Sequence, residues 1–391
     1  MRTVRRLLPP SLNSFFLFGP RGTGKTSWLK QAFPDALKID LLQPENTRLY
    51  AGNPERLRDM IPGYLATQSS TTIVLDEIQK VPQLLDVVHS LHETHPQLQF
   101  VMTGSSARKI RRQNNNLLGG RASLRIMHPF LAGEMGPQFQ LDRALQYGML
   151  PVIWGQRHPI DALKSYVGTY LGKEVQHEGF IRRAGPFERF LSLASFSHGS
   201  LPNAASIARE CGASQPTVQT YFEILEDLLL SFRVPIFVKR AKRILVGKAK
   251  FYYADIGIYR TLRPKGVLDR PEEIEGFCLE GLVAQHLRAW CDYFGDGAKL
   301  YYWRTKAGLE VDFILDGPGE LWAIEVKHSA VVRREYLTSL RAFGKDYPEA
   351  KRLFLYRGRE TLVIDSILCL PCEDFLLQLR DENFLPFRFP V

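Results

Sequence analysis

The sequence has no long apolar run. No stretch approaches the roughly 18 consecutive apolar residues that a membrane-spanning helix needs, so we expect no such span. Residues 1–18 have a basic start and an apolar end, as a signal peptide does. Pro9, Pro10 and several polar residues interrupt this segment, and its apolar end continues into a glycine-rich stretch. We therefore predict that it is not a signal peptide.

Cysteine is also scarce, with five residues in a chain of 391. They provide no disulfide framework. Cys369 and Cys372 have the spacing of a redox pair, but a zinc site would need a second pair, which the sequence lacks. We interpret them as small apolar residues at the end of a strand and expect a protein of the reducing cytoplasm.

Positive charge exceeds negative charge. The chain has 51 Lys and Arg residues against 41 Asp and Glu residues, a formal net charge of +10. This excess favours anionic partners, of which ATP and nucleic acid are the obvious candidates, although it also fits a merely soluble protein. The length predicts two or three domains, at about 150 residues per domain.

A phosphate-binding motif follows the first apolar run. Residues 15–18 are continuously apolar, as in a strand buried on both faces, and residues 27–33 have a helical pattern that ends before Pro34. Between them stands the Walker A sequence GPRGTGKT, whose glycines let backbone N–H groups converge on phosphates. Lys25 would reach the β- and γ-phosphates, and Thr26 would hold Mg²⁺. The predicted ATP-binding residues are Gly19, Pro20, Arg21, Gly22, Thr23, Gly24, Lys25 and Thr26.

A second apolar strand, residues 71–75, ends in two acids, as a Walker B motif does. Asp76 would support Mg²⁺, and Glu77 is the candidate base that polarises the attacking water. Two acids at a strand end are common, but here they follow a Walker A motif. Further along the chain, Arg121 stands after two glycines. It is either an arginine finger for a neighbouring subunit or a solvated or ion-paired arginine.

The middle of the chain has a helical pattern. Apolar residues recur at three- and four-residue spacing from residue 141 to 196, with breaks at Gly148 and Pro151, which predicts a helical lid over residues 137–200. Arg182 and Arg183 could reach nucleotide from this lid, but such arginines are more often solvated.

Residues 203–230 resemble a helix-turn-helix with Gly212 in the turn and Ser214 capping the second helix. Polar side chains that can read base edges are expected on the exposed face of that helix, namely Gln215, Thr217, Gln219 and Thr220. No Lys or Arg accompanies them, but the basic stretch 239–250, which includes Lys250, could contact a nucleic-acid backbone as a wing. The alternative is a purely structural winged helix.

The last third predicts a helix over residues 277–290 with Glu280 near its start, followed by strands over 299–304, 310–315 and 321–327. With a period of two, Glu310 and Asp312 share one face of their strand, while Val311, Phe313 and Leu315 point into the core. In the next strand Glu325 and Lys327 share a face.

An acid in one strand, with an acid and a lysine at i and i+2 in the next, is the arrangement that metal-dependent phosphodiester cleavage needs. Asp312 and Glu325 would bind Mg²⁺ through carboxylate oxygens, and Glu280 would complete the metal shell. Lys327 would polarise the attacking water or stabilise the developing charge. Hairpins that carry exposed acids and lysines are common, so the motif alone is weak.

Taken together, these motifs resemble those of prokaryotic AAA-type P-loop ATPases with a C-terminal PD-(D/E)xK nuclease-like domain. The resemblance covers nearly the whole chain and is carried by residues 19–26, 75–77, 103–106, 120–121, 166–171, 310–313 and 325–327. It implies ATP binding and hydrolysis, a winged-helix-like middle and a nuclease-like C-terminus. It also implies a polar residue, called sensor 1, between the two Walker motifs. Ser105 is the candidate, with Ser106 next to it, and a strand cap is the alternative.

One departure concerns Lys173 and Glu174, where relatives tend to carry Arg-Asp, so no role is transferred to these two residues. The predicted fold class is α/β. The predicted regions are an AAA-type core over 1–136, the lid over 137–200, a winged-helix-like region over 201–265 and a restriction-endonuclease-like domain over 266–391.

The predicted function is ATP hydrolysis that drives an action on nucleic acid, DNA rather than RNA, in a cytoplasmic homo-oligomer, with metal-dependent nuclease activity as an added hypothesis. The alternative is an ATP-switched binding or sensor protein whose nuclease-like domain only recognises a partner.

Overall fold

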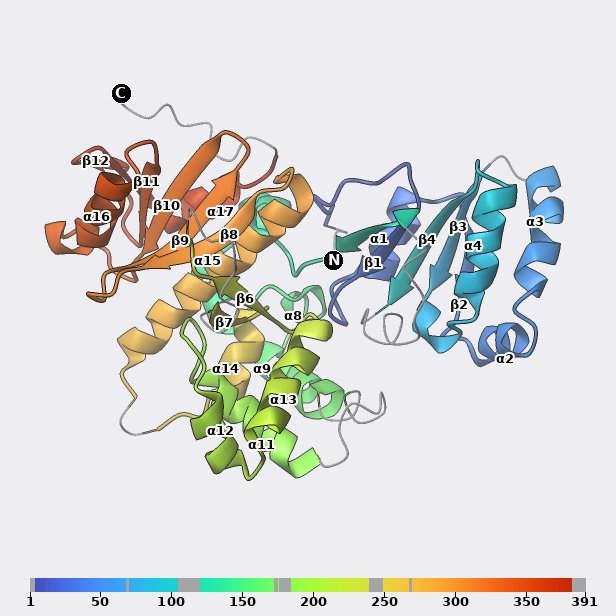
Figure 1. The fold of residues 1–391 in the computed structure, drawn as a ribbon, viewed down its shortest axis with the longest axis horizontal. Coiled ribbons are helices and arrows are strands. Elements are labelled where there is room, and N and C mark those ends of the chain that lie inside the picture. The colour runs from blue at the N-terminus through green and yellow to red at the C-terminus, as the bar shows by residue number, and fades with distance from the viewer. Residues whose placement is uncertain are drawn as a thin grey trace. The chain divides into compact units, whose positions relative to one another are not determined.

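The computed structural model describes residues 4–67, 70–104, 120–171, 175, 184–238, 249–266 and 269–381. The chain divides into two compact units. The first, here called the P-loop unit, comprises Leu8–His128 with Asp227–Leu229. The second, here called the C-terminal unit, comprises residues 1–7, Pro129–Glu226 and Leu230–Val391. Figure 1 shows the P-loop unit mainly in blue and cyan and the C-terminal unit in green to red.

A five-stranded parallel sheet forms the core of the P-loop unit. Its strands, in the spatial order β2-β3-β4-β1-β5, are β1 (Phe15–Phe18), β2 (Leu37–Asp40), β3 (Thr72–Asp76), β4 (Gln99–Gly104) and β5 (Ser123–Ile126). Its helices are α1 (Lys25–Ala32), α2 (Pro44–Gly52), α3 (Arg56–Thr67), η1 (Ile78–Lys80) and α4 (Leu84–Thr94).

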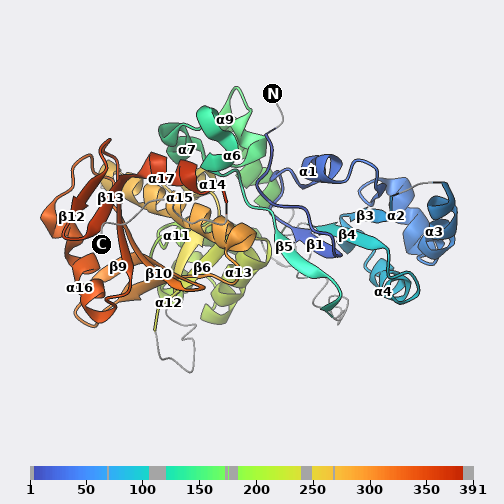
Figure 2. The same ribbon diagram turned by 90° about the horizontal axis from the view of Figure 1, so that it is seen from above.

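Helices cover both faces of this sheet, which explains why β1 is apolar throughout. The rings of Phe15 and Trp28, on α1, meet edge to face, whereas Phe16 and Phe18 belong to a core cluster with residues of α3 and α4. Figure 2 shows α1 and α4 on opposite sides of the strands. Because the strands are parallel, their carboxyl ends share one edge of the sheet, where the Walker A and Walker B residues stand.

The helical middle belongs to the C-terminal unit. Its elements are α6 (Ala132–Met135), η3 (Gly136–Gln138), α7 (Leu141–Tyr147), α8 (Pro151–Trp154), α9 (Pro159–Ser165), η4 (Tyr166–Leu171), α11 (Ala184–Ser195), α12 (Ala204–Cys211), α13 (Gln215–Asp227) and α14 (Ile256–Leu262). The buried Asp255 caps α14 by accepting from the N–H groups of Gly257 and Ile258, and it also accepts from Met149 N at 2.6 Å. The predicted lid helices therefore pack against α14 within the C-terminal unit.

The predicted helix-turn-helix forms as α12, a turn and α13. Asn203 caps α12, Gly212 takes the left-handed conformation that glycine favours, with φ of 69°, and Ser214 Oγ accepts from Thr217 N at 3.3 Å. An antiparallel hairpin follows, formed by β6 (Ser231–Pro235) and β7 (Ala249–Tyr253). The other basic residues of the predicted wing, Lys239, Arg240, Lys242, Arg243 and Lys248, lie outside the described residues.

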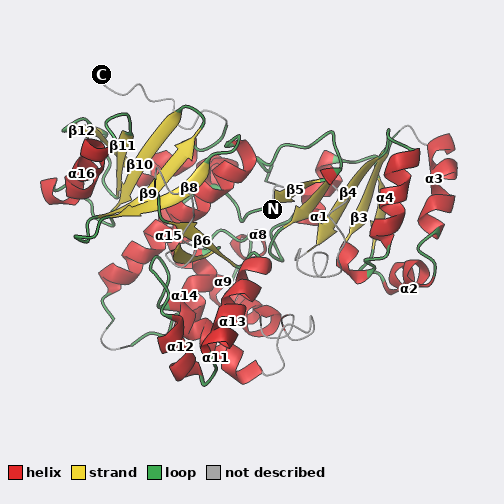
Figure 3. Cartoon of the chain, in the orientation of Figure 1, coloured by secondary structure: helices red, strands yellow, loops and turns green. Residues whose placement is uncertain are grey.

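A six-stranded mixed sheet forms the rest of the C-terminal unit (Figure 3). Its strands, in the spatial order β12-β13-β11-β10-β9-β8, are β8 (Lys299–Arg304), β9 (Glu310–Gly317), β10 (Glu320–Val326), β11 (Lys351–Tyr356), β12 (Leu362–Ile364) and β13 (Ile367–Pro371). Its helices are α15 (Pro271–Phe294), η5 (Arg334–Leu337), α16 (Thr338–Asp346) and α17 (Cys372–Gln378).

Two expectations for this region were wrong. Helix α15 begins at Pro271 rather than at residue 277, so Glu280 lies in its third turn. Strand β9 does not keep a strict period of two, because its register against β8 shifts between Tyr301 and Trp303. As a result Val311 and Ile314, three residues apart, pack in the same hydrophobic cluster.

No helix in the described part of the chain combines the length and apolarity required to cross a membrane.

Candidate functional site

The Walker A residues form a tight turn between β1 and α1. Gly22 and Gly24 have φ values of 79° and 87°, a conformation that residues with a Cβ rarely adopt. Gly19 is required for space, since a Cβ there would lie 2.5 Å from the carbonyl oxygen of Met127. These glycines allow the sharp turn after β1, and α1 begins directly after it at Lys25. The N-terminus of this helix, with its backbone N–H groups, follows the loop, as phosphate binding requires.

The side chain of Lys25 stays at this loop. It is buried, and its Nζ donates to the carbonyl oxygens of Gly19 at 2.7 Å and Pro20 at 3.3 Å. Thr23 Oγ1 donates to Pro20 O at 2.8 Å. These contacts hold the ammonium group beside the loop amides, where it can meet an incoming phosphate.

The Walker B acid lies beside the Walker A threonine. Thr26 Oγ1 donates to Asp76 Oδ2 at 3.1 Å, and Thr103 Oγ1 donates to Asp76 Oδ1. The same Thr103 oxygen accepts from Glu77 N at 3.1 Å. Thr103 therefore joins both Walker B acids, a role that sequence reasoning did not assign to it. The available signal was its place near the end of β4, the strand that pairs with β3.

Glu77 has an unusual backbone. It adopts the left-handed conformation, with φ of 62° and ψ of 49°, which is uncommon for residues other than glycine and asparagine and costs about 1 kcal/mol or more. Gln79 Nε2 donates to Glu77 Oε2, and Gln79 packs over Gly104, where a Cβ would meet its Oε1 at 2.5 Å. The sharp turn after β3 thus brings the Glu77 carboxylate within hydrogen-bond distance of the Gln79 side chain.

Most of the other predicted nucleotide contacts lie outside the described residues, namely Ser105, Ser106, Arg182 and Arg183. The same holds for Lys173 and Glu174, to which no role was assigned. Arg121 is partly exposed and pairs with Glu93 on α4 at 3.1 Å. It precedes β5, whereas the P-loop follows the carboxyl end of the parallel neighbour β1. Arg121 therefore stands at the opposite edge of the sheet from the phosphate loop of its own unit.

In the C-terminal unit four acids come together, here called the acidic cluster: Glu280, Glu310, Asp312 and Glu325. A lysine lies among them. Lys250 Nζ is 3.1 Å from Glu280 Oε1, 2.7 Å from Glu310 Oε1 and 3.7 Å from Asp312 Oδ1. Lys250 is 3% exposed. The prediction of an exposed wing cation is thus wrong for Lys250, because β7 directs this residue into the protein.

Further hydrogen bonds fix the acidic cluster. Tyr252 OH donates to Glu280 Oε1 at 2.5 Å, and Val326 N donates to Asp312 Oδ2 at 2.8 Å. Lys327 Nζ pairs with Glu325 Oε1 at 2.6 Å, while Glu325 Oε2 is buried with no hydrogen-bond partner in the described part of the chain.

Burial and mutual repulsion govern the protonation of these groups. Burial raises the pKa of Glu325 to about 8, and the nearby Asp312 contributes in the same direction. Burial also raises the pKa of Glu280, although Lys250 opposes this shift. Burial alone would lower the pKa of Lys250, but the surrounding acids, Glu280 foremost, raise it well above that of a free lysine. Lys250 is therefore charged at neutral pH.

The arrangement does not fit a divalent metal ion. Carboxylate oxygens suit Mg²⁺, which needs them at about 2.0–2.1 Å, but an ammonium group already lies within hydrogen-bond distance of two of these acids. Among the residues that the structure describes, no group of three or more His, Cys, Asp or Glu could hold a metal ion. The described arrangement therefore does not form the predicted metal shell of Glu280, Asp312 and Glu325, because Lys250, which was expected in the wing, lies among these acids.

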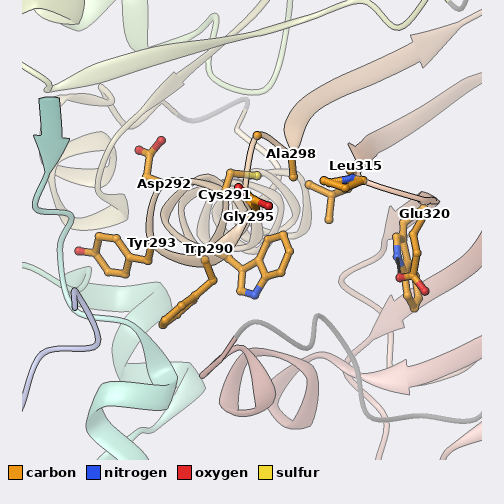
Figure 4. Close-up of a pocket in the computed structure, with 14 residues that line it drawn as sticks. Trp290, Cys291, Asp292, Tyr293, Gly295, Ala298, Leu315 and Glu320 are labelled. Carbon is orange, nitrogen blue, oxygen red and sulfur yellow. Dashed lines mark hydrogen bonds between the residues drawn. The ribbon is translucent and has the colours of Figure 1, made fainter. Parts of the chain in front are cut away.

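Other candidate features have no link to these sites. A pocket of about 760 Å³ lies at the end of α15 and is lined by Trp290, Tyr293 and Trp322 among others, but by none of the predicted site residues. Figure 4 shows this pocket with its lining residues as sticks. Cys369 and Cys372 are buried free cysteines, and burial raises the pKa of their thiols to about 11 and about 12. They are therefore protonated and, as predicted, small apolar residues at a strand end.

The parallel sheet, the phosphate loop and the paired Walker motifs define an AAA-type P-loop ATPase domain. In agreement, residues 12–136 match a family model described as an AAA domain. Residues 138–269 and 275–375 match two models, DUF8612 and DUF4143, each described as a domain of unknown function. The match to an AAA domain confirms the predicted AAA-type ATPase. The other two matches do not support a nuclease, because both families are described as of unknown function.

Over 371 residues the chain is 26% identical to uncharacterized proteins of Mycobacterium tuberculosis and Mycobacterium bovis, an alignment that covers 92% of this chain and 80% of each relative. Among solved structures, the replication initiator DnaA bound to AMPPCP and single-stranded DNA aligns with 56% of this chain and 83% of its own, at 12% identity and a TM-score of 0.27. A TM-score this low does not establish a shared fold.

Proposed function

We propose that the P-loop unit binds ATP with Mg²⁺ and hydrolyses it. The observation that carries this proposal is the chain of contacts Thr26–Asp76–Thr103–Glu77 beside the phosphate loop. In P-loop ATPases a hydroxyl and a carboxylate of this kind bind the magnesium ion that contacts the phosphate oxygens, and Glu77 supplies a second carboxylate one residue further on.

Each residue then has a defined task. Loop amides and Lys25 bind the phosphates, while Thr26 and Asp76 hold the metal ion. Mg²⁺, when bound with ATP, neutralises charge on the β- and γ-phosphates. Glu77 orients the attacking water and accepts its proton. Thr103 positions both acids, and Gln79 holds the Glu77 carboxylate through a hydrogen bond.

The substitution Glu77→Gln tests the proposal, because it keeps the shape of the side chain but removes the base. We expect ATP affinity within a few-fold of the parent and a hydrolysis rate reduced by about 100-fold or more. Glu45→Gln, an exposed acid on α2, is the matched control. A Glu77→Gln variant that turns over at the parent rate would show that Glu77 is not the base.

We further propose that α13 contacts nucleic acid. Gln215, Gln219 and Thr220 are exposed on this helix, which follows the turn at Gly212, and the hairpin of β6 and β7 completes a winged-helix-like order of elements. Amide and hydroxyl side chains can bond base edges, and the positive net charge favours a polyanion.

Fluorescence anisotropy with labelled duplex DNA tests this contact. We expect binding that weakens steeply with salt, and a loss of about tenfold or more in Gln215→Ala/Gln219→Ala. Gln156→Ala, at an exposed glutamine outside α13, should bind as the parent does. Absence of any binding to DNA or RNA at low salt would contradict the proposal and favour a protein-binding switch.

A further inference from the structure

We propose that Lys250 is the permanent cation of the acidic cluster, so that the cluster is a closed, metal-free site that turns into a divalent-metal site when this ammonium group is removed. This inference goes beyond the proposed ATP hydrolysis and does not depend on it, because the acidic cluster lies entirely in the C-terminal unit.

The ammonium group of Lys250 occupies the space that a metal ion would need. Lys250 Nζ approaches carboxylates from two different elements, Glu280 on α15 and Glu310 and Asp312 on β9. A metal ion bound to these oxygens would have to lie at about 2.0–2.6 Å from them, within the space of the ammonium group. The two cations also repel each other, so binding of one excludes the other.

Lys250 also balances the negative charge of the acidic cluster. The acidic cluster holds four carboxyl groups, and its lysines are Lys250 and the partly exposed Lys327. Without the ammonium group of Lys250, Glu280, Glu310 and Asp312 would lose their shared cation, and among the described residues the remaining positive charges would be Arg304, 3.7 Å from Glu310 Oε2, and Lys327, which pairs with Glu325. Buried like charges are unfavourable unless a cation or protons compensate them. A divalent ion can supply that charge once the ammonium group is gone, because the carboxylate oxygens that surrounded Lys250 could then close around the ion.

Glu325 adds a buried carboxylate oxygen to the acidic cluster. This side chain is 4% exposed, and its Oε2 atom has no hydrogen-bond partner in the described part of the chain. A buried carboxylate oxygen without a partner is rare and calls for an explanation. It supplies a further oxygen ligand that Lys250 does not use.

The origin of Lys250 explains how the cluster stays closed. Lys250 lies on β7, where it pairs with Val234 of β6, and Tyr252 on the same strand donates to Glu280. The hairpin that follows α13 thus delivers both the cation and a hydroxyl to acids of the C-terminal sheet and α15. The closed state therefore depends on the hairpin remaining docked.

The test is a thermal unfolding series with the full nucleotide-free chain, with and without millimolar Mn²⁺. We expect no Mn²⁺-dependent change in Tm for the wild type. Lys250→Met, which keeps the length of the side chain without its charge, should have a Tm lower by about 5 °C or more, and Mn²⁺ should raise it by at least about 3 °C. Lys299→Met, at an exposed lysine of β8, should behave as the wild type does.

Three outcomes decide the matter. Adding Asp312→Asn to Lys250→Met should abolish the response to Mn²⁺, because it removes a ligand. A wild type that Mn²⁺ stabilises, with the gain lost in Asp312→Asn, would overturn the proposal, and this comparison remains valid if Lys250→Met does not fold. A folded Lys250→Met variant that ignores Mn²⁺ would overturn it as well. ATP hydrolysis, measured in parallel on the wild type, reports separately on the P-loop unit.

Discussion

The phosphate loop and the acidic cluster contain the same kinds of residues in opposite arrangements. In the loop, Lys25 rests on carbonyl oxygens while Asp76 accepts from two hydroxyl groups. In the acidic cluster, Lys250 rests directly on carboxylates. In the loop, backbone carbonyl oxygens hold the lysine and hydroxyl groups hold the acid, whereas in the acidic cluster the lysine and the acids compensate one another's charge. A lysine and acids in one motif therefore do not by themselves define a ligand site.

The largest expected effect is at the phosphate loop. Lys25→Ala removes a cation that bonds the β- and γ-phosphates, and charge-assisted hydrogen bonds contribute about 1.5–3 kcal/mol each. We expect ATP affinity to fall by about 100-fold or more in calorimetry. Lys30→Ala, at an exposed lysine of the same helix, should change little. Equal affinities for the two variants would mean that ATP binds elsewhere.

The next effect concerns Thr103. Thr103→Val keeps the shape of this buried residue but removes the hydroxyl group that joins Asp76 to the backbone of Glu77. Since it positions the acids and does not itself bind ATP, we expect the hydrolysis rate to fall by about 10–100-fold with less than about threefold loss of affinity. Thr94→Val, on the surface of α4, is the control. A loss of affinity as large as the loss of rate would assign Thr103 to binding instead.

A smaller effect is expected for the acidic cluster, in which Glu325 should make the free energy of unfolding depend on pH. The pKa of Glu325 is raised from 4.5 to about 8 on folding, so between these values the folded chain holds a proton that the unfolded chain has lost. The free energy of unfolding should therefore decrease as pH rises through this window, by up to about 1.4 kcal/mol per pH unit for this one group.

Urea unfolding of the wild type and of Glu325→Gln across this pH range measures the difference. The free energy of unfolding of Glu325→Gln should lack this pH dependence. Relative to that of the wild type, it should therefore increase as pH rises toward 8. Glu335→Gln, at an exposed acid, should run parallel to the wild type. If the free energies of unfolding of the wild type and Glu325→Gln changed in parallel with pH, Glu325 would not be the group that titrates in this range.

The smallest effect is expected for Arg121. Because it stands at the edge of the sheet opposite to its own phosphate loop, it can assist hydrolysis only in a neighbouring subunit. ATPase activity per chain should then rise several-fold with protein concentration, and Arg121→Ala should flatten that rise. A flat dilution profile for the wild type, with a monomer in light scattering, would leave Arg121 as a surface partner of Glu93.

The parts that the sequence predicted well are those set by local pattern. Residues 15–26 combine an apolar strand, glycines at positive φ and a helix start, each of which leaves its own trace in the sequence. The parts that it missed depend on tertiary contacts. Lys250 is 30 residues from Glu280 and 62 from Asp312, and nothing local shows that β7 turns it inward. The register shift in β9 likewise depends on its pairing with β8.

The most direct test of the contrast between the two regions counts bound Mn²⁺. Electron paramagnetic resonance measures free Mn²⁺ while the wild-type chain is titrated with and without a non-hydrolysable ATP analogue. We expect one bound Mn²⁺ per chain with the analogue, at Thr26 and Asp76, and none without it. A tightly bound ion in the absence of nucleotide that disappears in Asp312→Asn would contradict it, because the acidic cluster would then hold a metal despite Lys250.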